Sequence, residues 1–363
     1  MPKRATTPVT LPGALLGLVL SGIAIFAGTT YVLVRQHIDT FQQAALEEAV
    51  TLRTRGVSTA FARALEQDWQ HLTAIAREVA VLDPEGLAPV LDAAAGPDQR
   101  VSWAGFARPD GTVIVASGGL LEGGDVSSRP WFQQGLQEDF AGDMHEAVLL
   151  ADLMAAGDSA PPRFLDLATP VEGPGGRVVG VLGFHINAAW AEDYLADLAE
   201  RMELDLLLVN PAGEVMIGTA PDLPDSFDLP RLSAAAATGV QTAGFDIWPD
   251  GMRYFTAVTP SVTFGALPSF GWRLVGRIDP ADFPATPARD LIRSTTVALT
   301  VATAIFALAT VLFIQLYIRP IGRLARNAER IADGHEDYPA EIRASAELQR
   351  LSASLARLES QRR

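Results

Sequence analysis

Two stretches of the chain carry no charged side chain, and each is long enough to cross a lipid bilayer. They run from Ala5 to Val34 and from Ser294 to Ile318, whereas a helix needs roughly 20 apolar residues to span the hydrocarbon core. The apolar run of the first stretch is longer than the roughly 7 to 15 residues of a cleaved signal peptide. We therefore predict two transmembrane helices, at residues 11–34 and 294–318, rather than a signal peptide and one helix.

The hydrophobic pattern between these helices changes once. From Arg35 to about Val81 apolar residues recur every three or four positions with no proline, which predicts a long helix. Its apolar stripe fits packing against the following domain, a dimer seam, or both. After Pro84, short runs of Val, Ile, Leu and Phe are separated by Gly, Pro and Asp. This pattern is typical of antiparallel strands joined by turns.

An internal repeat divides this strand-rich region. The turn Arg108-Pro109-Asp110-Gly111 has its counterpart in Asn210-Pro211-Ala212-Gly213, and each turn lies between two apolar runs. The two copies also close alike, with an apolar strand at residues 178–184 in the first and at residues 272–278 in the second. The repeat predicts two similar α/β modules in series, joined by a helix at residues 190–201.

Basic residues beside the apolar helices predict the topology. Lys3 and Arg4 precede the first helix, and Arg319, Arg323 and Arg326 follow the second. Since Lys and Arg next to a membrane segment tend to stay in the cytoplasm, we place residues 1–10 and 319–363 there. Residues 35–293 then form one loop on the outer side.

Composition and charge agree with an ordered protein whose outer loop is acidic. The chain is 48% hydrophobic and 20% charged, and its net charge is −15. Because the two predicted cytoplasmic segments are basic, the outer loop carries the negative charge, which disfavours nucleic acid or anionic lipid as its ligand. The chain has no cysteine, which suits an oxidising compartment without proving one.

With these features in order, the outer loop resembles the double Cache sensors of bacteria. The turn repeat, the segment Ser128-Arg129-Pro130-Trp131-Phe132, the strand pair at residues 164–171 and 177–186, and the closing Gly271-Trp272-Arg273-Leu274-Val275 carry the resemblance over about residues 35–290. It implies an α/β fold with tandem PAS-like modules on a long N-terminal helix. Residues 35–199 would hold that helix and the membrane-distal module, and residues 200–290 the proximal module.

The resemblance implies that the distal module binds the ligand and that Arg129, Trp131 and Phe132 line the pocket. A guanidinium can grip a carboxylate through two parallel hydrogen bonds, and an indole supplies an apolar wall. Alternatively, Arg129 pairs with a local acid such as Asp125, while Trp131 and Phe132 fill the core.

By the same resemblance, members that bind amino acids supply two acids and a tyrosine. Asp152 occupies the place of the first acid, His185 that of the second, and Gly124 that of a tyrosine. This departure argues against an α-amino acid, so we predict a small organic anion held by Arg129, with His185 as a second donor. Alternatives are that His185 is a core residue or, less favoured, that it binds a metal with His145 and Asp152. We expect no metal or cofactor.

For the proximal module, the sequence does not decide whether anything binds. Its Trp248, Arg253 and Tyr254 fit a core or a pocket rim equally well.

The segment after the second apolar helix resembles a HAMP domain. Apolar residues repeat in steps of three and four from Ile321 to Ile331 and from Leu348 to Leu358, which predicts two short coiled-coil helices. Pro320, Gly334 and Glu347 match the pattern of that domain, while Ala346 stands where an Asp is usual. The resemblance implies a parallel four-helix bundle in a dimer; the alternative is an unrelated coiled coil.

These features together predict a homodimeric receptor of the bacterial inner membrane that is not an enzyme. Residues 319–363 have no room for a catalytic domain, and His335-Glu336-Asp337 lies in a connector rather than in the helix of a phospho-acceptor. Signalling would then pass to a separate cytoplasmic effector. The alternative is the truncated sensor half of a histidine kinase, diguanylate cyclase or methyl-accepting chemoreceptor; a structural anchor is a third, weaker reading.

Overall fold

The computed structural model describes residues 11–79, 84–96, 100–146, 162–220, 229–283, 286–335 and 345–362. It contains two compact units. Residues Gln43–Phe283 form one, which we call the sensor unit. Residues Met1–Gln42 and Pro284–Arg363 form the other, which we call the helical unit.

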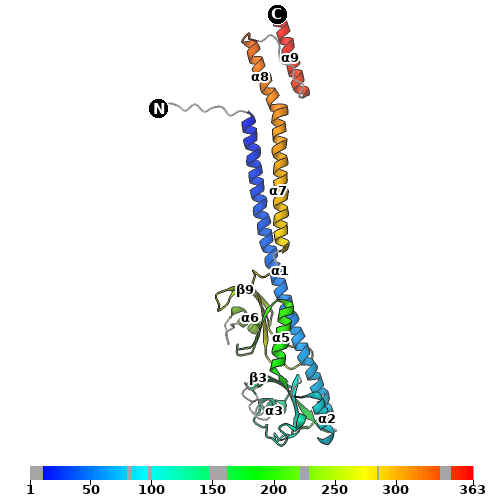
Figure 1. The fold of residues 1–363 in the computed structure, drawn as a ribbon. Helices are drawn as coiled ribbons and strands as arrows, with labels where there is room; N and C mark the ends of the chain where they lie inside the picture. The colour runs from blue at the N-terminus through cyan, green and yellow to red at the C-terminus, as the bar shows by residue number, and fades with distance from the viewer. Residues whose placement is uncertain are drawn as a thin grey trace, which may run out of the picture. The chain divides into compact units, whose positions relative to one another are not determined.

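The long helix predicted after the first apolar stretch is continuous with that stretch. Helix α1 (Leu11–Val79) has 69 residues, begins in the helical unit and continues into the sensor unit (Figure 1). One surface of its sensor part, from Val50 through Phe61 to Leu72, is fully buried. Packing therefore stabilises this half of the helix, which is how most protein helices gain stability.

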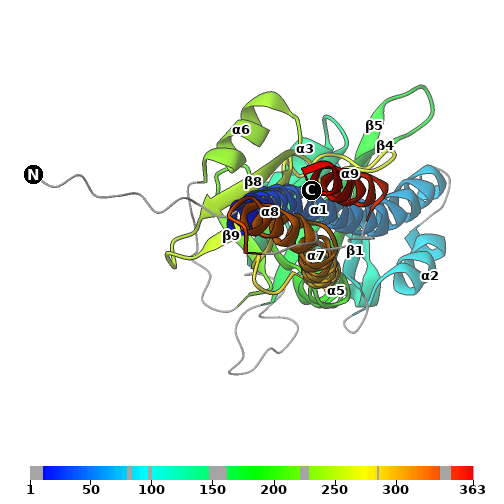
Figure 2. The same ribbon diagram turned by 90° about the horizontal axis from the view of Figure 1, so that it is seen from above.

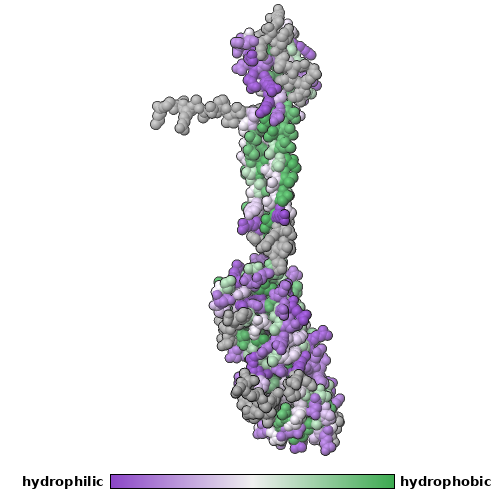
Figure 3. All heavy atoms as spheres, in the orientation of Figure 1, coloured by the Kyte–Doolittle hydropathy of each residue, from purple (hydrophilic) through white to green (hydrophobic). Residues whose placement is uncertain are grey.

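Two helices of the described chain are long and apolar enough to cross a membrane, judged by length and composition. One is the first part of α1, and the other begins in α7 (Thr286–Phe313). Figure 3 shows the hydrophobic surface along both. Large apolar side chains lie exposed there, among them Ile25 at 70% and Phe306 at 61%, which is the arrangement that a lipid environment favours.

The helix that contains α7 continues beyond it. A π-helical turn, η2 (Ile314–Ile318), leads into α8 (Arg319–Ala332), whose second residue is Pro320. The last helix is α9 (Ala346–Arg362). The two helices predicted after the second apolar stretch are therefore present, and most of the connector between them lies outside the described residues.

The first module of the sensor unit is a five-stranded antiparallel sheet in the order β2-β1-β5-β4-β3. Its elements are α2 (Pro84–Ala94), β1 (Val101–Ala107), β2 (Val113–Ala116), the short helix η1 (Ser117–Gly119), α3 (Pro130–Gly135), β3 (Phe140–Glu146), β4 (Arg163–Glu172) and β5 (Val178–Asn187).

The second module repeats this topology, with the order β7-β6-β10-β9-β8. Helix α5 (Ala188–Met202) joins the modules and contacts α1 through Trp190 and Phe61 (Figures 1 and 2). The other elements are β6 (Asp205–Val209), β7 (Val215–Gly218), α6 (Pro230–Thr238), β8 (Thr242–Ile247), β9 (Arg253–Thr259) and β10 (Arg273–Ile278). The repeat and the connecting helix predicted from the sequence are confirmed.

Each sheet is buried on both faces, and the two-residue period of the strands sorts the side chains between them. In β6, Leu206 and Leu208 join the core shared with α1, whereas Leu207 and Val209 join the core under α6. In β4, Leu165 and Leu167 likewise face α1, and Phe164 and Ala168 face the core under α3. In each module, the sheet face turned away from α1 is therefore covered by a shorter helix, α3 in the first module and α6 in the second.

Candidate functional site

Arg129 immediately precedes helix α3. Pro130 opens that helix at a position where a missing N–H costs nothing, and the carbonyl of Arg129 accepts from the N–H groups of Phe132 and Gln133 at 3.1 and 3.0 Å. The side chain is half-buried. Among the described residues its guanidinium has no hydrogen bond or ion pair, and Asp125 instead accepts from the N–H of Ser127 at 2.8 Å.

Trp131 and Phe132 pack into the core under α3. They are only 3% and 2% exposed, and their rings meet edge to face with centroids 5.9 Å apart. Gly183 makes room for the indole, since a Cβ at that position would lie 2.8 Å from Cζ3 of Trp131. Both aromatic rings therefore fill the core under α3, which is the alternative that the sequence analysis gave for them.

His185 on β5 is buried beside Asp166 on β4. The carboxylate Oδ1 of Asp166 lies 2.6 Å from Nδ1 of His185, and Asp166 is only 4% exposed. Its other oxygen, Oδ2, lies 3.6 Å from Nε2 of His145 on β3. One buried carboxylate therefore holds two imidazoles, one of them buried and the other partly open to solvent.

Aromatic rings complete the surroundings of His185. Trp103 stacks on the imidazole at 4.7 Å, Phe164 lies at 5.9 Å, and Trp131 meets it edge-on at 5.8 Å. Carboxylates and aromatic faces are both favourable partners for a protonated imidazole. The ring of Trp131, next to Arg129 in the chain, thereby meets the closing strand at His185, whereas among the described residues no contact joins the Arg129 side chain to His185.

Asp166 was missed by the sequence analysis, although the pattern contained a signal. It lies within an apolar strand and in phase with Phe164 and Ala168, which marks it as an inward-facing acid on the α3 side. Asp152, the acid chosen instead, lies outside the described residues. Within the described chain no group of three potential metal ligands is found, and His145 and His185 both turn to Asp166.

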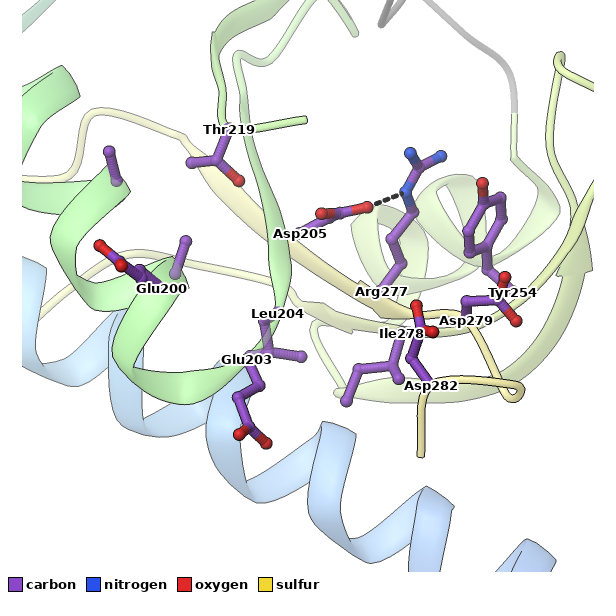
Figure 4. A pocket seen from close by; sticks show the side chains of 12 residues that line it. Glu200, Glu203, Leu204, Asp205, Thr219, Tyr254, Arg277, Ile278, Asp279 and Asp282 are labelled. Carbon is purple, nitrogen blue, oxygen red and sulfur yellow. Dashed lines mark hydrogen bonds and ion pairs between the residues drawn. The ribbon is translucent and has the colours of Figure 1, made fainter. Parts of the chain in front are cut away.

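The second module contains a cavity of about 550 Å³. Its wall is formed by α5, the start of β6, the end of β10 and the turn that follows (Figure 4). Arg277 is the cation of this wall, and its side chain is 6% exposed. Its Nε donates to Asp205 at 3.0 Å, and Tyr254 beside it donates to Asp250 at 3.0 Å. Burial, aided by the bond to Asp250, raises the pKa of the Tyr254 phenol.

A single carboxylate connects the two modules. Asp143 on β3 accepts from the indole N–H of Trp272 at 2.7 Å and from the side-chain amide of Asn210 at 3.1 Å. Trp272 in turn stacks on Phe270 at 4.0 Å and on Phe61 of α1 at 6.3 Å. The Asn210 turn and the Gly271-Trp272 segment, both notable in the sequence, are therefore held by one acid of the first module.

A half-buried ion pair ties α1 to the first module. Arg100 lies 2.6 Å from Asp68 of α1, donates to the carbonyl of Ala64, and stacks over Trp190 of α5 at 3.8 Å. Burial raises the pKa of Asp68 to about 6, because desolvation of its carboxylate outweighs the attraction of Arg100.

Comparison with known families identifies the C-terminal part. Residues 313–358 match the model of the HAMP domain. The predicted HAMP segment is thereby confirmed, and it follows directly on the second apolar helix. No curated protein matches the chain.

Solved structures resemble the sensor part at low sequence identity. The extracellular domain of rpHK1S-Z16, a protein assigned as a histidine kinase, matches with a TM-score of 0.50 and 14% identity, covering 65% of this chain and 95% of that domain. This match shows a shared fold. An extracellular ligand-binding receptor from Desulfohalobium retbaense matches at 0.47 and 11%, covering 63% of this chain and 40% of its own. The ligand-binding domain of the Pseudomonas aeruginosa amino acid chemoreceptor PctB, in complex with L-Arg, matches at 0.48 and 16%, covering 66% and 99%.

Proposed function

We propose that this chain is a transmembrane signal receptor of the bacterial inner membrane. Its sensor unit lies outside the cytoplasm, its two apolar helices cross the membrane, and its HAMP domain passes the signal to a cytoplasmic effector. The observation that carries the proposal is the HAMP match at residues 313–358, directly after an apolar helix that follows a domain with the fold of an extracellular sensor. A HAMP domain in that position is a relay.

The ligand of the first module is a small organic anion that the side chain of Arg129 grips. Three features support this proposal: Arg129 is half-buried and its guanidinium has no partner among the described residues, it is followed by the core anchors Trp131 and Phe132, and Trp131 contacts the imidazole of His185. Asp166 orients the imidazole of His185 through the bond at Nδ1. Asp152 belongs to the proposed pocket as well, through the resemblance alone.

Signalling requires two states of the receptor that bind the ligand unequally. We place these states in a homodimer, because a HAMP bundle needs two copies of α8 and α9. Leu324 and Leu348 are already covered within one chain, whereas Ile321, Leu351 and Leu358 are 41%, 52% and 61% exposed. A second copy would cover this remaining apolar surface.

The test uses the full-length chain in lipid nanodiscs. All six tryptophans lie in the sensor unit, so tryptophan emission during heating follows that unit alone. A panel of small mono- and dicarboxylates is added, and the ligand raises the melting temperature because it binds only the folded sensor.

Arg129→Ala abolishes the shift in this account, while Arg177→Ala, an exposed arginine of the same module, preserves it. A panel without any stabilising carboxylate, or a shift that survives Arg129→Ala, rejects the proposed anion site.

A further inference from the structure

The strand register places Arg277 of the second module where His185 stands in the first. Trp103 on β1 pairs with His185 on β5, and Asp205 on β6 pairs with Arg277 on β10. Trp103 and Asp205 each lie five residues before the first residue of the repeated turn, at Arg108 and Asn210. The cavity of the second module is thus built around the same strand position as the site of the first.

Arg277 is buried, yet most of its donors are unused. Its Nε bonds Asp205 at 3.0 Å, while Nη1 lies 3.9 Å from Asp250, which is too long for a hydrogen bond. Among the described residues the two terminal nitrogens have no hydrogen-bond acceptor. These N–H groups face the cavity, where solvent reaches them, so a ligand in the cavity can supply the acceptors that the protein does not.

The guanidinium is also held in one orientation. Its Cζ lies 4.2 Å from the ring centre of Trp248 and 4.0 Å from that of Tyr254. The hydrogen bond from Nε to Asp205 fixes the orientation of the group between them. Because this planar guanidinium is already oriented, it loses little conformational entropy on binding, and its two terminal N–H groups match the two oxygens of a carboxylate.

Three further acids border the cavity. Asp279 and Asp282 lie beside Arg277 in the turn after β10, whereas Glu200 lies on α5 with its carboxylate turned away from Arg277 (Figure 4). None of these three carboxylates forms an ion pair among the described residues. A simple anion would be repelled by them, whereas an ammonium group would be attracted.

We infer that the second module holds a second ligand site and that its ligand is a small zwitterion. The ligand's carboxylate binds the terminal nitrogens of Arg277, and its ammonium group binds the acids Asp279 and Asp282 beside them. The cavity of about 550 Å³ is within the range of roughly 300 to 1,000 Å³ of small-molecule sites. This site goes beyond the proposed function, which assigns an anion to the first module only.

The site lies close in sequence to the second apolar helix. Asp282 precedes helix α7, which starts at Thr286, by four residues. A zwitterion that bridges Arg277 of β10 and Asp282 therefore binds at the end of the sensor unit that is covalently joined to that helix.

The test is isothermal titration calorimetry on the full-length chain in nanodiscs. The zwitterions 5-aminopentanoate and 6-aminohexanoate, each with one charge of either sign, are compared with pentylamine, which lacks the carboxylate, and pentanoate, which lacks the ammonium group. At least one zwitterion binds at least ~10-fold more tightly than both single-charge compounds, because each charged contact contributes on the scale of a tenfold change.

Two variants test the two poles of the site. Arg277→Lys and the rim variant Asp279→Asn with Asp282→Asn each weaken this binding by at least ~10-fold. If Arg277→Lys does not fold, the rim variant still tests the site, because both aspartates lie in a turn where the substitution leaves the core intact. Arg253→Lys, a cation of the same module stacked on Phe245 and away from the cavity, leaves binding unchanged.

Arg129→Ala in the first module leaves zwitterion binding intact, which separates this site from the proposed anion site. The inference is overturned if neither zwitterion binds at millimolar concentration, if pentylamine binds as tightly as the zwitterions, or if both pole variants bind like the unmodified chain.

Discussion

At the scale of single residues, the two modules differ in how they stabilise a buried charge. Asp166 of the first module is held by His185 and His145, and Arg277 of the second by Asp205 and two aromatic rings. Removing one partner from such a pair leaves the other buried and unpaired, which costs more than the pair contributes.

Asp166→Ala therefore lowers the free energy of unfolding of the sensor unit by about 2 to 4 kcal/mol. Guanidinium-induced unfolding of the full-length chain in nanodiscs, followed by tryptophan emission, measures the change. Asp197→Ala removes an exposed ion pair with Arg201 on α5 and leaves the stability almost unchanged, because exposed pairs contribute little. Equal losses for the two variants would refute a buried role for Asp166.

Asp68 makes the stability of the sensor depend on pH. Its pKa of about 6 in the folded chain lies above the ordinary value of 3.8, so the folded state holds the proton more tightly than the unfolded state. The stabilising contribution is therefore complete below about pH 4 and is lost as the pH rises through about 6.

Unfolding measured between pH 4 and 7 should show this loss, which is at most on the order of 3 kcal/mol. Asp68→Asn cannot ionise and still reaches Arg100, so its stability falls less over the same range. If the two proteins show the same slope between pH 4 and 7, Asp68 does not titrate in this way.

At the scale of elements, strand β3 links the first module to the second. His145 at one end of the strand contacts Asp166, the buried acid that also holds His185. Asp143, two residues earlier, accepts hydrogen bonds from Trp272 and Asn210. Trp272 then leads into β10 and Arg277. Asp166 is thus connected through packed, hydrogen-bonded groups to β10, the last strand before α7.

Asp143→Ala breaks both hydrogen bonds to the second module while leaving the first-module cluster in place. Hydrogen exchange on the full-length chain should show faster exchange in β10 and in the Asn210 turn, with β4 and β5 unchanged, because the junction opens locally. Glu146→Gln, an exposed acid on the same strand, is the matched control. Unaltered exchange in β10 would show that Asp143 does not hold the modules together.

The sequence predicted the architecture better than the site. Periodicity and the repeated turn were sufficient for α1, for α5 and for both sheets, because these depend on local pattern. The role of Asp166 was not predicted, because a single acid in an apolar strand can be assigned to a site only when its neighbours in space, His145 and His185, are known. The role of Arg277 was not predicted for the same reason, since its partner Asp205 is 72 positions away in the sequence.

At the scale of the whole molecule, the proposed topology places the sensor unit and the HAMP domain on opposite sides of the membrane. The chain has no cysteine, so single cysteines can be introduced without background. In spheroplasts, a membrane-impermeant maleimide labels Arg177→Cys in the sensor at once, and Arg350→Cys on α9 only after detergent is added. Labelling of both before detergent would exclude this topology.

The central claim, that ligand binding outside the membrane is relayed to the HAMP domain, is tested most directly by two probes in one molecule. An environment-sensitive fluorophore is attached at Arg350→Cys in the full-length chain in nanodiscs, and tryptophan emission reports on the sensor. The carboxylate that stabilises the sensor is then titrated. The account predicts that both signals change with the same midpoint, and that Arg129→Ala removes both. A sensor that saturates while the α9 probe stays constant would contradict the relay.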